Sequence, residues 1–433
     1  MSKAEFLTRL PVLLRPDPAR TVIRPYVPAA DPRAAHPTDR TRAQRIAERV
    51  LNLDKPALTE ELRRLFEDFS DRHGCVACVF TRRFHEVNGQ LIEKCSVSPD
   101  QALLIGAYFC HEYSYEAAAL FNPSIVPHPD QAGVPAGSVR FVLSLRGVGE
   151  GHISSVTFRT GTCGPDGAVA IDPPSPRAIV PRIESLANGI PDDTGVRIIC
   201  DESHDLSECV IFPITPSQRN GIEDVRLVHF VDDDGSATYF GTYTAYSGQT
   251  IRQELLQTDD FRNFELRPLS GDATSGKGMA LFPRRIDGRF AALGRQDNEN
   301  LWFLTSDDLH RWNGGAQAVA PRWPWEFVQI GNCGSPIEID EGWLVITHGV
   351  GAVRNYGIGV CLLDRQNPAK LLARMTRPLL RSDPEERAGY VPNVTYSCGA
   401  MVHSRMLLLP YAVADSFTTF ATVPIDQLLA AME

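Results

Sequence analysis

The sequence has no apolar run that reaches the roughly 20 residues of a membrane-spanning helix. It also lacks an excess of positive charge, since 43 Lys and Arg stand against 53 Asp and Glu and give a net charge of −10. Such a balance disfavours a nucleic-acid-binding surface and is compatible with a small neutral ligand. The N-terminus lacks the apolar core and the cleavage site of a secretory signal. We therefore expect a cytoplasmic protein that binds neither membranes nor nucleic acid.

Patterns typical of metal and nucleotide sites are also missing. Most of the 10 cysteines lie within apolar runs, which predicts reduced core residues. Cys75 and Cys78 form a lone CxxC, and without a second pair at metal spacing they do not predict a zinc site. The glycines at 147–151 precede a strand, whereas phosphate binding would require a helix N-terminus there. We expect neither a metal nor a cofactor.

The first 115 residues predict an extended arm followed by helices. Many prolines within residues 1–40 indicate the arm. Ser98 and Gln101 have the spacing of a capping box and begin a helix that we expect to run through residues 102–113. Two earlier helices are indicated by apolar residues at helical spacing, namely Ala43, Ile46, Ala47, Val50 and Leu51, and then Leu58, Leu62, Leu65, Phe66 and Phe69. We expect this extension to act as a lid or as a contact in a homo-oligomer.

Residues 116–433 predict an all-β domain, because short β-rich runs alternate there with turns rich in Gly, Asp and Asn. The segments 257–264 and 305–312 repeat one pattern, with Asp260 and Asp308 separated by 48 residues. A period of this length is typical of a four-stranded propeller blade. The length of the region then predicts a β-propeller of five or six blades, and a pair of β-sandwiches remains the alternative.

Acidic residues beside these strands are candidates for acid–base chemistry. Glu223 and Asp224 precede the strand at 227–231, and strand alternation sends their side chains to opposite faces. Glu338 lies between a Gly- and Pro-rich turn and an apolar strand that ends at His348. Glu299 is a further carboxylate, next to the strand at 301–304.

Several of these segments resemble glycoside hydrolase family 130, the β-mannosidases and β-mannoside phosphorylases. The resemblance is carried by the runs GIEDVR at 221–226 and GNCGSPIEIDEGWLVITHGV at 331–350. It implies a five-bladed β-propeller, with Asp224 as the general acid acting through the 3-hydroxyl of the sugar. Its implied substrate-binding residues are Asn122, Ser124, Arg146, His152, Lys277, Arg295, His348, Tyr396 and Asp415.

The resemblance also bears on the attacking group. In the phosphorylases of this family a basic residue that helps to hold phosphate stands where this chain has Glu338. A carboxylate repels phosphate but can activate water. We therefore expect an inverting hydrolase that releases mannose from the non-reducing end of short β-mannosides, β-1,2-linked by analogy, with Glu338 as the base and Glu299 as a further catalytic carboxylate.

Two alternatives remain open. In the first, Lys277 and Arg295 hold inorganic phosphate as a co-substrate, and the protein is an inverting phosphorylase that produces mannose 1-phosphate. In the second, the same pocket binds a mannose-containing oligosaccharide without cleaving it.

Overall fold

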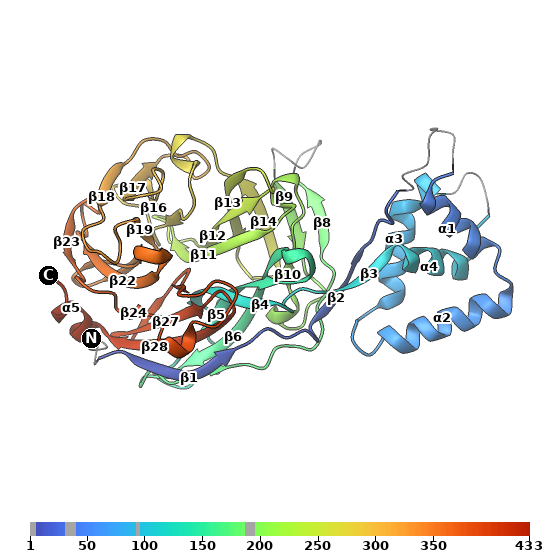
Figure 1. Cartoon of the computed structure of the whole chain (residues 1–433), viewed down its shortest axis with the longest axis horizontal. Coiled ribbons are helices and arrows are strands. Elements are labelled where there is room, and N and C mark those ends of the chain that lie inside the picture. The colour runs from blue at the N-terminus through green and yellow to red at the C-terminus, as the bar shows by residue number, and fades with distance from the viewer. Residues whose placement is uncertain (1–5, 31–39, 92–95, 187–194) are drawn as a thin grey trace. The chain divides into compact units, whose positions relative to one another are not determined.

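The computed structural model describes residues 6–30, 40–91, 96–186 and 195–433, and it divides into two compact units. Unit 1 comprises residues 1–17, 116–174 and 181–433, and unit 2 comprises residues 18–115 and 175–180. Among these residues, unit 1 is built mainly from β-strands, and unit 2 contains four helices and a two-stranded sheet. Figure 1 shows the elements of both units. Among the described residues, no helix combines the length and the apolarity of a membrane span.

The described strands of unit 1 form five antiparallel sheets, and we name them A to E in the chain order of their main strands. Sheet A contains β4 (Ala119–Pro127), β5 (Val139–Val148), β6 (Ser154–Cys163), β7 (Val169–Ile171) and β10 (Val210–Ile211). Sheet B contains β11 (Ile222–Val231), β12 (Ala237–Tyr246), β13 (Ile251–Thr258), β14 (Asn263–Pro268), β9 (Val196–Ile199) and β8 (Arg182–Ser185). Sheet C contains β15 (Ala280–Leu281), β16 (Phe290–Gly294), β17 (Leu301–Ser306) and β18 (Ala316–Val319).

The last two sheets complete the unit. Sheet D contains β19 (Gln329–Asn332), β20 (Ile337–Ile339), β21 (Gly342–Val350), β22 (Tyr356–Leu363), β23 (Leu371–Arg374) and β24 (Leu380–Arg381). Sheet E contains β25 (Thr395–Tyr396), β26 (Met401–His403), β27 (Met406–Val413), β28 (Phe417–Pro424) and β1 (Thr8–Leu14), and the short helix α5 (Ile425–Ala430) follows it. The expectation that this part of the chain is mainly β is confirmed.

The five sheets contact one another in a closed order. Strand β4 of sheet A contacts β11 of sheet B, β12 contacts β15, β16 contacts β19, β22 contacts β25, and β27 of sheet E contacts β4 again. Each of these contacts involves an edge strand of a sheet. We call these edge strands the first strands of their sheets, although β8 and β9 of sheet B and β1 of sheet E come earlier in the chain; they are β4, β11, β15, β19 and β25. Residues on the first strands of different sheets are therefore brought together although they are distant in sequence.

Sheet E joins the two ends of the chain. Strand β1, which the sequence assigned to an extended arm, pairs antiparallel with β28, and the two lie side by side in Figure 1. Leu10 of β1 packs against a cluster that includes Phe141 of sheet A and Phe420 of sheet E. The arm was a wrong prediction for these residues, because alternation of half-buried and exposed side chains makes β1 an edge strand.

The repeat found in the sequence marks equivalent turns of neighbouring sheets. Asp260 lies between β13 and β14, and its carboxylate accepts hydrogen bonds from the backbone N–H groups of Arg262 and Asn263. Asp308 lies between β17 and β18 and accepts one from the N–H of His310. Each aspartate therefore caps the turn between the third and fourth strands of an antiparallel series, which is β11 to β14 in sheet B and β15 to β18 in sheet C.

Unit 2 contains α1 (Arg42–Leu51), α2 (Lys55–Phe69), α3 (Val76–Leu91), α4 (Pro99–Tyr108), β2 (Thr21–Pro25) and β3 (Cys110–Ser114). The helices α1 and α2 were predicted, and the capping box of Ser98 and Gln101 is present at α4. Helix α4 ends at Tyr108 instead of continuing to 113, because the chain turns into β3, which pairs with β2. Helix α3 was not predicted.

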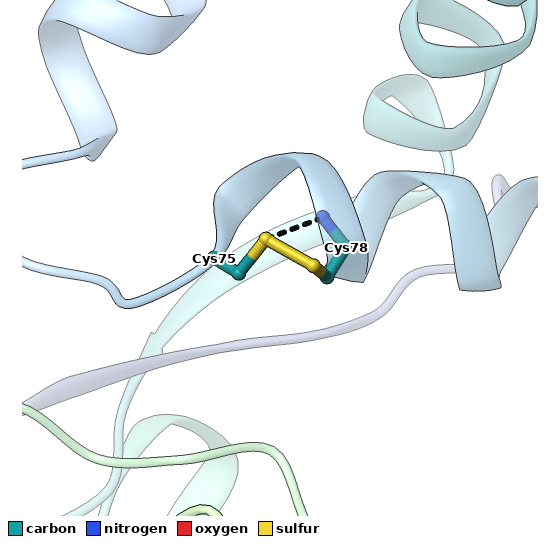
Figure 2. Close-up of a disulfide and its surroundings, with 2 residues drawn as sticks. All are labelled: Cys75 and Cys78. Carbon is teal, nitrogen blue, oxygen red and sulfur yellow. Dashed lines mark hydrogen bonds between the residues drawn. A yellow bond between two sulfur atoms is a disulfide. The ribbon is translucent and has the colours of Figure 1, made fainter.

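The cysteines differ from their predicted state at one place. Cys75 and Cys78 form a disulfide at the start of α3 (Figure 2), so they are not reduced core residues. Seven other cysteines are free, and six of them are buried, as predicted. Cys95 lies outside the described residues.

We predict that the closure of sheet E by β1 contributes measurably to stability. Leu10→Ala removes apolar contacts with the cluster shared by sheets A and E and should lower the free energy of unfolding by about 1–2 kcal/mol. Leu13 lies on the same strand but is 45% exposed, so Leu13→Ala should cost less than about 0.5 kcal/mol. Urea unfolding of both variants checks this, and equal losses would contradict the packing of Leu10 against this cluster.

Candidate active site

Two neighbouring first strands are bulged at the same level. The register of β4 with β5 shifts between Phe121 and Ser124, and the register of β11 with β12 shifts between Glu223 and Arg226. A residue in each bulge has a positive φ, 49° at Asn122 and 54° at Asp224. Left-handed backbone is rare outside glycine, and bulges often re-aim side chains at functional sites. Here the two bulges turn Asn122 and Asp224 towards each other.

Asp224 lies at the centre of a hydrogen-bonded cluster. Its Oδ1 accepts a hydrogen bond of 2.6 Å from Asn122 Nδ2 and one of 3.3 Å from Arg146 Nη1. Arg146 Nη2 donates to Glu223 Oε1 at 3.2 Å, and Lys277 Nζ donates to Glu223 Oε2 at 2.6 Å. The prediction that Glu223 and Asp224 face opposite sides was wrong, because the bulge breaks the alternation and one guanidinium contacts both.

The charge of Asp224 follows from these neighbours. Burial alone would raise the pKa of its carboxyl, but the guanidinium groups of Arg146 and Arg226 and the hydrogen bond from Asn122 together lower it below the usual value. Asp224 is therefore a carboxylate at neutral pH when no ligand is present. A general acid at this position needs a negative charge nearby that raises the pKa again.

A second group of side chains adjoins the first through Arg226. Arg226 Nη1 donates to the backbone oxygen of Asp224 at 2.9 Å, and Nη2 donates to the hydroxyl of Tyr396 at 2.9 Å. The ring of His348 lies edge-on to Tyr396, with centroids 5.0 Å apart. Arg295 Nη1 lies 2.8 Å from His348 Nε2.

His348 is uncharged in this setting. Burial, followed by the positive charges of Arg295 and Arg226, holds its pKa well below the usual value. The neutral ring can therefore accept a hydrogen bond from Arg295 at Nε2. Arg226 and Arg295 form no ion pair with a carboxylate in the part of the chain that the structure describes, so their charges are available to an anion.

Buried polar atoms without a partner gather in this cluster. Among the described residues they include Oδ1 of Asn122, Nδ1 of His348, and the Nε atoms of Arg146, Arg226 and Arg295. Folded proteins leave few such atoms unsatisfied, and each one invites an explanation. Five within one connected cluster indicate a site that a polar ligand completes.

Asp415 adds a third carboxylate to the cluster. Burial and the nearby charge of Asp224 raise the pKa of its carboxyl to about 6, although Arg146 and Arg354 act in the opposite direction. Asp415 also has a positive φ of 51°, like Asn122 and Asp224. A carboxyl that titrates near pH 6 can bind sugar hydroxyls either as an acceptor or, when protonated, as a donor.

An exposed aromatic pair lies beside Asp415. The ring of His152 stacks on that of Tyr390, with centroids 5.6 Å apart, and Tyr390 is 69% exposed. The backbone N–H of Tyr390 donates to the hydroxyl of Ser416, which fixes this segment next to Asp415. An exposed aromatic face beside polar groups is the usual platform for a sugar ring.

A cavity of about 510 Å³ opens at the end of sheet D where β21 meets β22. Its lining includes Trp325, Asn355, Arg377 and Arg381. It does not include Asp224, Arg146 or the other members of the cluster, so it is not the site described above.

Glu338 does not belong to this cluster. Its carboxylate accepts hydrogen bonds from Arg284 Nε at 2.8 Å and Arg284 Nη2 at 2.7 Å. It pairs with Trp343 at one end of β21, and His348 lies five residues further along that strand. At about 3.3 Å per residue these positions are about 16 Å apart. The expectation that Glu338 is the catalytic base is therefore corrected, because this carboxylate is held in a separate, partly exposed ion pair.

Two other predicted residues have local structural contacts. Glu299 is exposed in the turn between β16 and β17, and its backbone oxygen accepts a hydrogen bond from the N–H of Ile330. No contact places its carboxylate beside Asp224 in the described structure. Ser124 is fully buried, and its hydroxyl accepts a hydrogen bond of 2.9 Å from the N–H of Leu227, which links β4 to β11. Ser124 thus holds the two bulged strands together.

The structure adds two residues that the sequence did not single out, Arg226 and Tyr390. Arg226 lies two residues after Asp224 and contacts Tyr396, and Glu223, already a candidate carboxylate, contacts Arg146 and Lys277 although strand alternation predicted that it faces away from Asp224. Tyr390 lies in a loop without any local signal, and its place beside Asp415 depends on the pairing of distant segments. Among the described residues, no three His, Cys, Asp or Glu side chains are grouped as metal ligands would be.

We predict that Asp415 makes unfolding depend on pH. A carboxyl whose folded-state pKa is raised to about 6 destabilises the fold as its proton is lost, so stability falls from about pH 4 to pH 6. Asp415→Asn should remove this fall. Its free energy of unfolding, relative to that of the parent protein, should be about 1–3 kcal/mol higher at pH 7 than at pH 4. Asp340→Asn, at a side chain that is 93% exposed, is the control for urea unfolding across this range. Parallel curves for the parent and Asp415→Asn would contradict the raised pKa.

Known proteins resemble this chain in both sequence and structure. A β-1,2-mannobiose phosphorylase from Listeria innocua is 30% identical over 233 residues, which are 52% of this chain and 63% of that protein. A 1,2-β-oligomannan phosphorylase from Thermoanaerobacter sp. strain X514 is 32% identical over 49% of this chain and 71% of its own length. The match thus spans about two thirds of these relatives.

Solved structures share the fold. The Listeria innocua enzyme in complex with β-1,2-mannobiose matches with a TM-score of 0.51 and 19% identity, over 72% of this chain and 92% of that one. A structure from Bacteroides ovatus matches with a TM-score of 0.53 and 18% identity, over 74% of this chain and 90% of that one. Residues 194–433, more than half of the chain, match the family model described as β-1,4-mannooligosaccharide phosphorylase. On this evidence the chain belongs to glycoside hydrolase family 130.

Proposed function

We propose that this protein is an inverting β-mannoside phosphorylase, which uses inorganic phosphate to cleave short β-1,2-linked mannosides and produces mannose 1-phosphate. The relatives named above, which are phosphorylases of β-1,2-linked mannosides, support this activity over hydrolysis. The expected hydrolase depended on Glu338, whose carboxylate is paired with Arg284 outside the cluster. We further propose that sheets A to E are the five blades of a β-propeller, which their closed order of contacts supports.

The observation that carries the proposal is a pair of guanidinium groups that form no ion pair with any carboxylate of the described residues. Arg226 and Arg295 donate to neutral acceptors, namely a backbone oxygen, a phenol and an imidazole. Lys277 is partly exposed and adds a third positive charge near Glu223. Planar guanidinium groups match the oxygen geometry of phosphate, and charge-assisted hydrogen bonds are the strong ones. These three residues would hold phosphate.

Phosphate binding also accounts for how Asp224 becomes an acid. The guanidinium charges lower the pKa of its carboxyl in the empty site. A phosphate that binds to Arg226 and Arg295 offsets those charges and adds a negative one, so the pKa of Asp224 rises. The acid is then protonated when both substrates are bound, which ties proton transfer to the presence of the nucleophile.

The reaction proceeds in a single displacement. A phosphate oxygen attacks the anomeric carbon of the mannosyl unit from the face opposite the leaving oxygen, and the glycosidic bond breaks. Asp224 supplies the proton that the leaving oxygen takes up, relayed through the 3-hydroxyl of the sugar as the family resemblance implies. Asn122 and Arg146 hold the Asp224 carboxylate in place. Asp415 and the stacked rings of His152 and Tyr390 would bind the sugar units.

Hydrolysis is the second candidate, and one observation favours it. Asp415 is a carboxyl near Asp224 whose pKa of about 6 suits a base that activates water. In that case the reaction needs no phosphate. A site that binds the sugar without turnover is a third outcome, which would leave Asp224 without a chemical role.

Product analysis with β-1,2-mannobiose, first without and then with phosphate, tests the proposed reaction. We expect mannose 1-phosphate and mannose in equal amounts with phosphate, and no cleavage without it. Asp224→Asn should lower kcat by about 10²–10⁴-fold, since it removes the proton donor. Glu338→Gln is the control and should keep kcat within about threefold. Release of mannose at the same rate without phosphate would establish hydrolysis, and binding without turnover would establish a sugar-binding protein.

Steady-state kinetics of Arg295→Met test the phosphate site separately. Loss of a charge-assisted contact of about 1.5–3 kcal/mol should raise the KM for phosphate about 10–100-fold. The KM for mannobiose should change less than about threefold, because Arg295 contacts His348 and forms no ion pair with Glu223, Asp224 or Asp415. Arg289→Met removes an exposed arginine that pairs with Asp307 and serves as the matched control. Equal increases in both KM values would contradict a phosphate-holding role.

A further inference from the structure

The disulfide of unit 2 has the local geometry of a reactive pair. Cys75 immediately precedes α3, and Cys78 lies in the first turn of that helix (Figure 2). Their Cα atoms are 5.1 Å apart. The backbone N–H of Cys78 donates to Sγ of Cys75 at 3.2 Å, as the dashed line in Figure 2 marks. The sulfur of Cys75 therefore accepts a hydrogen bond from the helix's own first turn.

Both cysteines are accessible to solutes. Cys75 and Cys78 are exposed, whereas six of the seven free cysteines in the described residues are buried. The remaining free cysteine, Cys110, is half-buried against the cluster that contains Val76, and burial raises the pKa of its thiol to about 11. Cys110 therefore stays a thiol at neutral pH and is a poor partner for exchange.

The local charges favour a thiolate at Cys75. No acidic residue lies in the first turn of α3, and the N–H groups at a helix N-terminus stabilise a negative charge. The hydrogen bond from Cys78 N–H to Cys75 Sγ acts in the same direction. A thiolate is the attacking species in disulfide exchange, and it is also the better leaving group.

A disulfide with only a stabilising role does not account for the exposure of both cysteines or for the hydrogen bond to Cys75 Sγ. The cysteines are three positions apart, and a cross-link over so short a loop restricts the unfolded chain little. Between them, Val76 is buried with Ile23 and Phe80, so this helical turn is already fixed by apolar packing.

We propose that Cys75 and Cys78 form a reversible dithiol–disulfide couple that exchanges with small thiols and disulfides of the glutathione class at the surface of unit 2. In the oxidising direction, the Cys75 thiolate attacks one sulfur of the small disulfide, and a small thiolate leaves. The Cys78 thiolate then attacks the sulfur of Cys75 in the mixed disulfide, and the second small thiolate leaves. The sum is one protein dithiol and one small disulfide giving one protein disulfide and two small thiols. Two electrons pass from protein to small molecule, and the reverse reaction uses two small thiols.

The couple is tested on the full-length protein with glutathione as the probe. The protein is equilibrated in buffers of varied ratio of reduced to oxidised glutathione, thiols are blocked by an alkylating reagent, and the peptide with Cys75 and Cys78 is weighed by mass spectrometry. We expect both thiols to appear and disappear together over a single transition. Cys78→Ser should retain one glutathione on Cys75, because the resolving thiol is gone. Cys110→Ser is the control and should leave the transition unchanged.

Three outcomes would overturn the proposal. The first is a disulfide that stays intact in excess reduced glutathione, or a dithiol that stays reduced in excess oxidised glutathione. The second is that Cys75 carries no glutathione in the variant Cys78→Ser. The third is a bridge from Cys75 to Cys110 or to Cys95 in place of Cys78. None of these readouts depends on mannoside turnover, so this test and that of the proposed phosphorylase activity fail or succeed independently.

Discussion

The contact of one guanidinium with two carboxylates is the constraint on which the site depends. Arg146 of β5 reaches both Glu223 and Asp224, which follow each other on β11. Consecutive residues of a regular strand cannot both point to one partner, so β11 must be bulged there. The bulge of β4 lies opposite and places Asn122 so that its amide donates a hydrogen bond to Asp224. Two strands are thus distorted together, and Ser124 ties them to each other at the base of the bulges.

The charge balance around this contact determines what the site can bind. Arg146 and Lys277 are matched by Glu223 and Asp224, whereas Arg226 and Arg295 contact neutral acceptors. An anion can therefore enter without displacing a carboxylate. The neutral state of His348 is part of this arrangement, because a protonated imidazole could not accept the hydrogen bond from Arg295. Under the proposed function, the same charges keep Asp224 ionised until phosphate arrives.

Much of the fold could be predicted from the sequence, because its signals are local. The spacing of apolar residues predicted α1 and α2, and Ser98 with Gln101 marked the start of α4. Strand β1 could not be predicted, since its place depends on pairing with β28 at the other end of the chain.

The site was less predictable, because it depends on strand register and direction. Asp224 was singled out from the run GIEDVR and stays a candidate, but the bulge that brings Glu223 beside it has no local signal. Glu338 and His348 were both assigned to the site, although Glu338, on β20, pairs with Trp343 near one end of β21 and His348 lies near the other end of that strand. The exposed position of Cys75 and Cys78 could not be predicted either, because α3 lacked a clear helical signal.

The central claim is that phosphate attacks directly, opposite a leaving group that receives its proton from Asp224. The most direct test is ¹H NMR of the reaction from its first turnovers. It shows the anomeric configuration of the sugar phosphate that forms first. A single displacement on a β-mannoside must give the α-phosphate, so we expect α-mannose 1-phosphate as the first product. The β-phosphate as the first product would mean a covalent intermediate on a carboxylate and would contradict the roles given to Asp224 and the arginines.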